Sequence, residues 1–85
     1  MIGKTHQRFW KHFEALPASV QKLAREKYAL WKRDPYHSSL RFEERRNFVC
    51  VVRIGMHHRA VGLRQGDIVA WFWIGTHEDY NRFRF

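Results

Sequence analysis

Residues 68–80 read Ile-Val-Ala-Trp-Phe-Trp-Ile-Gly-Thr-His-Glu-Asp-Tyr, and this stretch decides the fold. Residues 68–74 are all apolar and mostly β-branched or aromatic, which predicts a buried central strand. Gly75 ends the run, and a short polar segment follows over residues 76–80. The strand therefore places a histidine, two carboxylates and a tyrosine at one edge of the sheet. Groups on a loop that a rigid scaffold holds often carry function. The alternative is that Thr76 caps a final helical turn and His77 is a solvated side chain.

Both sides of this predicted strand are apolar. Strict alternation places Ile68, Ala70, Phe72 and Ile74 on one side and Val69, Trp71 and Trp73 on the other. A helix hairpin covers only one face of a sheet, so the second face needs another cover. We interpret the second face as a partner surface or a binding concavity. The alternative is a tightly curled sheet with the tail of residues 78–85 folded across it.

Further strands precede this one along the chain. Alternating apolar residues predict strands over 48–54 and 58–64, and residues 40–43 form a candidate edge strand. The turns at residues 55–57 and 65–67 are short and contain glycine. Strands joined by such short turns form an antiparallel meander.

The first part of the chain has helical periodicity instead. Apolar residues recur every three or four positions over 6–16, and again from Pro17 to Asp34. The second helix is expected to begin at Pro17 and to stop at Asp34, because the residue before Pro35 is pushed out of helical geometry. The predicted fold class is therefore α+β: an N-terminal helix hairpin packed on a curled antiparallel sheet of three to four strands.

Length and composition set further bounds. A chain of 85 residues has room for one domain, expected to span residues 1–85. The single cysteine, Cys50, excludes an internal disulfide and a multi-cysteine zinc site, and its apolar surroundings predict a buried hydrophobic residue. No signal peptide is recognisable, and the longest apolar run is too short to cross a bilayer. A cytoplasmic protein without a membrane partner is expected.

The charge is strongly unbalanced. Sixteen Lys and Arg residues against eight Asp and Glu residues give a formal net charge of +8. Such an excess predicts attraction to a polyanion, most commonly a nucleic acid, although an acidic protein would satisfy the same field.

Three protic or cationic side chains are expected to meet at one end of the sheet. Arg53 ends one predicted strand, Arg59 begins the next, and the last strand returns His77 to that end. Two guanidinium groups and an imidazole suit a phosphate. Such a trio can cleave RNA without a metal, by activating a 2′-hydroxyl and stabilising the pentacovalent phosphorus, or it can only bind phosphate. Neither a metal nor a cofactor is expected.

Motifs in a fixed order run through nearly the whole chain. They are Ala15-Leu16-Pro17, Asp34-Pro35-Tyr36-His37-Ser38-Ser39-Leu40, Val52-Arg53-Ile54-Gly55, Arg59-Ala60-Val61-Gly62 and Trp71-Phe72-Trp73-Ile74-Gly75-Thr76-His77-Glu78-Asp79-Tyr80. This order resembles the RelE/ParE toxin superfamily of bacterial type II toxin–antitoxin systems. The resemblance implies two helices packed on a curled antiparallel sheet. Relatives usually begin with a strand, for which residues 2–5 are only a weak candidate.

The resemblance implies two possible activities. RelE-like members cleave mRNA on the ribosome without a metal and so inhibit translation, whereas ParE-like members inhibit DNA gyrase and are not nucleases. A ribosome-dependent endoribonuclease toxin is the favoured expectation. A gyrase inhibitor and an inactive RNA- or phosphate-binding relative are the alternatives. The expected partners are an acidic antitoxin, the ribosome and mRNA.

The resemblance also assigns expected catalytic roles. His77 would transfer protons, Arg59 would hold the scissile phosphate, and Arg53 would assist. Some nucleolytic relatives use a glutamate as the base, and neither Glu43 nor Glu44 can be given that role from the sequence.

A second group of residues is expected to bind substrate. Its members are Tyr80, His58 and Arg82. Tyr80 would stack on a base or orient it. His58 stands where many relatives have an aromatic residue before the arginine, so its role is open.

Overall fold

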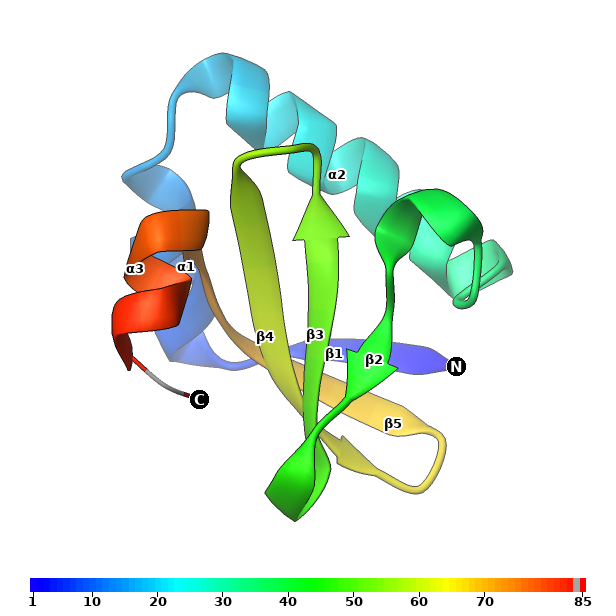
Figure 1. The fold of residues 1–85 in the computed structure, drawn as a ribbon. Helices are drawn as coiled ribbons and strands as arrows, with labels where there is room; N and C mark the ends of the chain where they lie inside the picture. Colours follow the sequence, from blue (N-terminus) through cyan, green and yellow to red (C-terminus); the bar gives the residue numbers. More distant parts are fainter. Residues whose placement is uncertain (84) are drawn as a thin grey trace.

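A mixed sheet of five strands forms the centre of the computed structural model, which describes residues 1–83 and 85. The strand order is β1–β5–β4–β3–β2 (Figure 1). The strands are β1 (Ile2–Thr5), β2 (Glu43–Glu44), β3 (Val49–Ile54), β4 (His58–Gln65) and β5 (Ile68–Thr76). β1 pairs with β5 in parallel, and the other neighbours are antiparallel. The α+β class and the meander are confirmed, but the sheet has five strands rather than three or four.

Strand β1 is the edge that the sequence barely indicates. It pairs from Ile2 opposite Ile68 to Thr5 opposite Trp71. Its residues are mostly exposed, so no alternating apolar pattern marks it. Gly3 brings the β1 backbone close to the end of the Tyr28 side chain, because a Cβ at this position would contact the Tyr28 hydroxyl oxygen. Backbone pairing to β5 and this close approach define the strand.

The opposite edge also differs from the expectation. Strand β2 covers only Glu43–Glu44, whereas an edge strand was predicted over residues 40–43. Leu40 ends a 3₁₀ turn, Ser38–Leu40, and its side chain is fully buried. This residue is apolar because it fills the core, and its burial does not require a strand.

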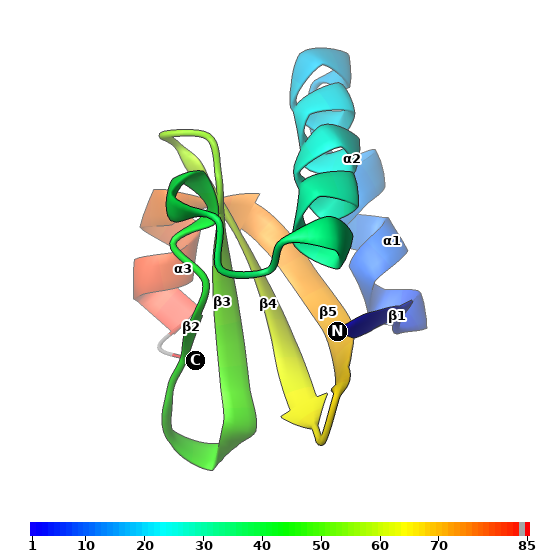
Figure 2. The ribbon, with the colours of Figure 1, turned by 90° about the vertical axis from the view of Figure 1, so that its right-hand side faces the viewer.

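Two helices cover one face of the sheet (Figure 2). They are α1 (Gln7–Glu14) and α2 (Ala18–Arg33). Pro17 is the N-cap of α2 rather than its first residue, so the helix begins one position later than predicted. Asp34 is the C-cap, as expected of the residue before Pro35. None of the helices that the structure describes is long and apolar enough to span a membrane.

A β-bulge in β5 changes which tryptophan faces the helices. Gly62 is paired with Trp71 and Val61 with Trp73, so Phe72 is an extra residue without a partner across the strand pair. Trp71 therefore packs in the core beneath α1 and α2, whereas Trp73 packs on the other face. The prediction that these two tryptophans share a side was wrong, because strict alternation fails at a bulge.

The second face of the sheet is covered by the C-terminal tail. A third helix, α3 (His77–Phe83), occupies the side opposite α1 and α2 (Figure 2). Beneath it, Val61 is fully buried and Trp73 is only 5% exposed. Phe85 packs against the same group of side chains. The apolar residues of this face are therefore covered by the folded tail, which was the alternative interpretation, and are not exposed as a partner surface or a binding concavity.

Candidate functional site

Arg53 and Arg59 lie directly opposite each other in the sheet. They are register partners between β3 and β4, and Arg59 is in turn opposite Gly75 of β5. Residues that oppose each other across strands project from the same face. Here that face is the one that carries α3, because Val51 and Val61, each two positions away, pack there. The expected convergence of the two arginines at one end of the sheet is thus present.

The two guanidinium groups are half-buried like charges. Partial burial, and then the positive charge of Arg53, lower the pKa of Arg59. Arg59 donates a hydrogen bond to the His58 carbonyl oxygen, at 2.9 Å. The Nε of Arg53 is buried and has no hydrogen-bond partner within the described residues. An anion between the two groups would relieve their repulsion and would accept hydrogen bonds from N–H groups such as the Arg53 Nε.

Tyr80 of α3 lies beside this pair. Its side chain is only 8% exposed. Burial raises the pKa of Tyr80, while the charges of Arg45 and Arg59 act in the opposite direction. The guanidinium carbon of Arg45 lies 5.6 Å from the centre of the Tyr80 ring. The phenol therefore lies near cations that come from different parts of the chain.

Glu43 and Arg45 belong to the same site, although the sequence did not reveal them. Glu43 pairs with Val51 across β2 and β3, so it faces the α3 side, whereas Glu44 pairs with Cys50 and faces the helix hairpin. The carboxylate of Glu43 is ion-paired with Arg45 at 2.7 Å. This hydrogen-bonded pair raises the pKa of Arg45. We call Arg53, Arg59, Tyr80, Arg45 and Glu43 together the arginine site.

His77 lies at the border of the arginine site. It is the first residue of α3, and its backbone N–H donates to the His57 carbonyl oxygen at 2.8 Å. The hydroxyl of Thr76 accepts a hydrogen bond from the Asp79 N–H at 3.1 Å, so Thr76 caps the helix. The imidazole is exposed, yet it stacks on the Tyr80 ring with 6.5 Å between ring centres. His77 thus contacts the site through Tyr80.

The other two expected substrate-binding residues lie apart from this group. His58 is paired with Ile54, whose side chain packs beneath the helix hairpin, so His58 projects from the face opposite Arg59. Burial, and then the nearby His57, lower the pKa of His58. Arg82 is largely exposed and lies 3.8 Å from Asp79 on the outside of α3. Neither side chain is brought to the arginine site.

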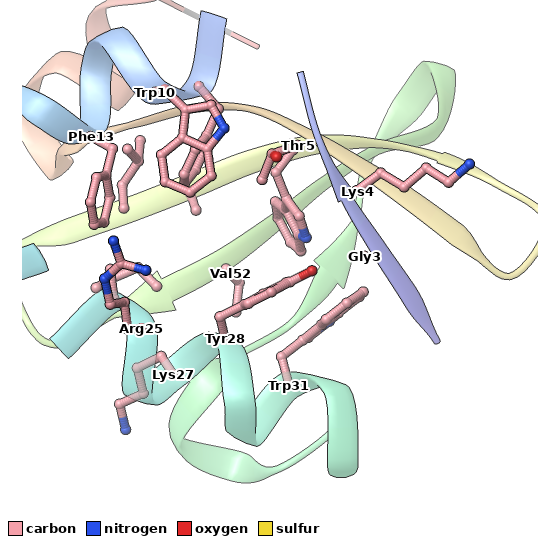
Figure 3. Close-up of a pocket in the computed structure, with 16 residues that line it drawn as sticks. Gly3, Lys4, Thr5, Trp10, Phe13, Arg25, Lys27, Tyr28, Trp31 and Val52 are labelled. Carbon is pink, nitrogen blue, oxygen red and sulfur yellow. The ribbon is translucent and has the colours of Figure 1, made fainter. Parts of the chain in front are cut away.

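The opposite face of the sheet holds an apolar cavity of about 270 Å³ (Figure 3). Phe13 of α1 and Trp31 of α2 form walls, and Trp71 lies on the sheet beneath. The indole N–H groups of Trp31 and Trp71 are buried and have no partner within the described residues. The cavity is bordered by three basic side chains: Lys4, Arg25 and Lys27. Within the described residues, no group of three or more His, Cys, Asp or Glu side chains is arranged to hold a metal ion.

A family model described as the ParE-like toxin domain matches residues 18–82. The chain belongs to the ParE-like toxin family. The matched segment includes all five residues of the arginine site and also His77. This ParE-like toxin is thus a member of the RelE/ParE superfamily of toxin–antitoxin toxins. No curated protein sequence matches the chain.

Solved structures share the fold of this ParE-like toxin at low sequence identity. The YoeB/ParE toxin from Agrobacterium tumefaciens is 18% identical with a TM-score of 0.68, covering 91% of this chain and 99% of its own. The RelB–RelE complex from Methanococcus jannaschii is 11% identical with a TM-score of 0.74, and the match covers 94% of this chain and 96% of that chain. The RelE–RelB complex from Pyrococcus horikoshii is 13% identical with a TM-score of 0.65, and the match covers 88% of this chain and 92% of that chain. These similarities extend the fold assignment over most of the chain.

Proposed function

We propose that this ParE-like toxin is a metal-independent endoribonuclease that cleaves mRNA on the ribosome and so inhibits translation. The observation that carries the proposal is the direct pairing of Arg53 with Arg59, beside Tyr80. Two guanidinium groups with free N–H donors match the geometry and charge of a phosphodiester. The net charge of +8 favours the approach of an RNA strand.

The reaction needs only a proton acceptor, a proton donor and a stabilised phosphorane. The 2′-hydroxyl loses its proton to a base, and its oxygen attacks the adjacent phosphorus. The bond from phosphorus to the 5′-oxygen then breaks, and that oxygen takes up a proton. The products are a 2′,3′-cyclic phosphate and a 5′-hydroxyl, and no water is consumed. Arg53 and Arg59 stabilise the negative charge that develops on the phosphorane oxygens.

We assign the proton transfers to His77. An imidazole exchanges protons readily near neutral pH, and this one is accessible at the border of the site. Tyr80 orients it through ring stacking. Glu43 is the other possible base on this face, but its ion pair with Arg45 favours a role in positioning that guanidinium.

Translating ribosomes programmed with a defined mRNA test the proposal. The wild-type protein is expected to cleave the message without added divalent metal beyond that required by the ribosome. Replacing the proton-transfer group by His77→Ala should slow cleavage by about 10²–10⁴-fold, the usual contribution of a general acid or base. Lys22→Ala, on the exposed side of α2, is the matched control and should retain activity. Intact mRNA with the wild-type protein would reject the proposal.

Inhibition of DNA gyrase is the second candidate, favoured by the description of the matching family model as ParE-like. This activity needs no proton transfer. A gyrase inhibitor would block DNA supercoiling equally well as wild type and as His77→Ala, and it would leave mRNA intact. The two assays therefore separate the candidates.

We also propose an acidic antitoxin as the protein partner, held at the cavity between α1 and α2. Two of the structurally similar toxins are found in complexes with RelB antitoxins. Because α3 covers the other face, this cavity offers an apolar surface on the side of α1 and α2. Its walls accept a large apolar side chain, and its basic border attracts a segment rich in Asp and Glu. Figure 3 places Lys4 and Lys27 on either side of the cavity, pointing away from it.

Charge reversal tests the location of the antitoxin. Arg25→Glu combined with Lys27→Glu should weaken binding of the proposed acidic antitoxin, while toxicity is retained. The control is Lys22→Glu combined with Arg33→Glu, which makes the same charge change on exposed residues that do not line the cavity. Equal antitoxin affinity in both double variants would place the contact elsewhere.

A further inference from the structure

The turn that connects β2 to β3 holds an exposed aromatic residue in an unfavourable backbone conformation. Asn47 and Phe48 have φ angles of 60° and 63°, in the left-handed region. Asn tolerates this region, whereas for a bulky residue such as Phe it is strained. Phe48 is 67% exposed, so packing of its ring in the core does not account for the strain.

The turn is nevertheless well defined by its own contacts. The N–H of Arg45 donates to the carbonyl oxygen of Val49 at 2.6 Å and closes the turn. Arg46 and Asn47 together with Arg45 line a shallow depression that Phe85 borders. A strained conformation that the surrounding structure maintains is commonly associated with function. Here Phe48 is exposed to solvent, and in the chain it closely follows two exposed arginine residues, Arg45 and Arg46.

The turn is connected to the arginine site by Arg45. The side chain of this residue lies over Tyr80, whose pKa responds to both Arg45 and Arg59. Arg53 stands near the far end of β3, four residues beyond Val49, which corresponds to about 13 Å along the strand. Arg59, Tyr80 and Arg45 are therefore neighbours, and the chain continues from Arg45 through the turn to Phe48.

We propose that residues 45–48 form a second contact for the RNA strand, in which Phe48 stacks on an unpaired base and Arg46 binds a phosphate. Alternating guanidinium and aromatic groups are the usual platform for single-stranded nucleic acid, because every base offers a π-face and every nucleotide a phosphate. The inference rests on the proposed RNA substrate and extends it by a few nucleotides to one side of the cleaved bond.

Binding of a labelled single-stranded RNA whose 2′-positions are all methylated tests the inference without cleavage. Fluorescence anisotropy with the full chain should show that Phe48→Ala weakens binding by about 5- to 150-fold, the range for loss of stacking on one base. Phe48→Trp should bind within about twofold of wild type, because it preserves the π-face. Phe48→Asn, which fits the left-handed backbone, should bind as weakly as Phe48→Ala although it relieves strain.

One control and one further variant make the outcome specific. Tyr36→Ala removes an equally exposed aromatic residue, 66% exposed, that packs on Phe42 on the helix side of the sheet, and it should bind RNA like wild type. Arg46→Ala should reduce the slope of log affinity against log salt concentration by about one unit, as expected for one lost phosphate contact.

Other results would overturn the inference. If Phe48→Ala binds RNA like wild type while Arg59→Ala binds weakly, the arginine site stands and the turn is not a contact. If the wild-type chain binds poly-glutamate through Phe48 but does not bind RNA, the turn contacts an acidic protein instead. Cleavage of mRNA on ribosomes is measured separately, so a failure of the catalytic proposal is recognised independently.

Discussion

Gly75 shows how a single residue shapes the candidate site. It precedes the cap of α3 and lies opposite Arg59 in the sheet. A Cβ at this position would stand 2.6 Å from the indole ring of Trp73, two positions earlier on the same face. The absence of a side chain thus allows Trp73 to lie across the strand, under α3. This close approach supports the surface on which Tyr80 rests.

We predict that Gly75→Ala lowers the free energy of unfolding by about 1–3 kcal/mol, the usual cost of overpacking in a core. Urea unfolding followed by tryptophan fluorescence measures this change. Combining Gly75→Ala with Trp73→Phe should give a smaller loss than the sum of the two single variants, because the smaller ring makes room for the methyl group. Simple additivity would show that the methyl group and the indole do not clash.

The residues of the arginine site differ in how readily they can be predicted from the sequence. The proximity of Arg53 and Arg59 could be predicted from the sequence, because a short turn at Gly55 fixes the register of the hairpin that carries them. Glu43 and Arg45 could not be found in the same way. Strand β2 has only two residues, and its register depends on tertiary pairing with β3 rather than on a local pattern.

Among the elements, those with a clear apolar period were predicted well and the irregular ones were not. Helix α2 and strands β3 and β4 agree with the expected ranges to within one or two residues. The bulge at Phe72 leaves no signal in a strand that is apolar on both sides. Helix α3 was expected as a polar segment, and only the possible cap at Thr76 indicated it. The cap and the stacking on Tyr80 together decide how His77 is presented.

The cap of α3 gives a prediction at this scale. Thr76→Ala removes the acceptor for the Asp79 N–H and should lower the free energy of unfolding by about 0.5–2 kcal/mol. Thr76→Ser keeps the hydroxyl and is the matched control, with a change close to zero. Chemical denaturation measures both. Because His77 and Tyr80 lie on this helix, mRNA cleavage by Thr76→Ala should also fall, whereas equal stability of the Ala and Ser variants would refute the capping role.

On the scale of the whole molecule, the sheet separates two surfaces. The α3 face carries the arginine site, and Arg45, which lies over Tyr80, joins this site to the turn with Phe48. The helix-hairpin face carries the apolar cavity with its basic border (Figure 3). The net charge of +8 favours the approach of polyanions to the molecule as a whole, and we propose that the side chains on each surface select between them. Under this account the RNA and the antitoxin bind on opposite sides, so variants can impair one interaction and preserve the other.

The most direct test of the central claim uses a ribosome-bound mRNA with a single 2′-deoxynucleotide on the 5′ side of the mapped cleavage position. The account predicts that the unmodified message is cut to a 2′,3′-cyclic phosphate and a 5′-hydroxyl, that the deoxy substitution abolishes the cut, and that Arg59→Ala slows the cut on unmodified mRNA. Cleavage of the deoxy message at the same position, or unchanged cleavage by Arg59→Ala, would contradict it.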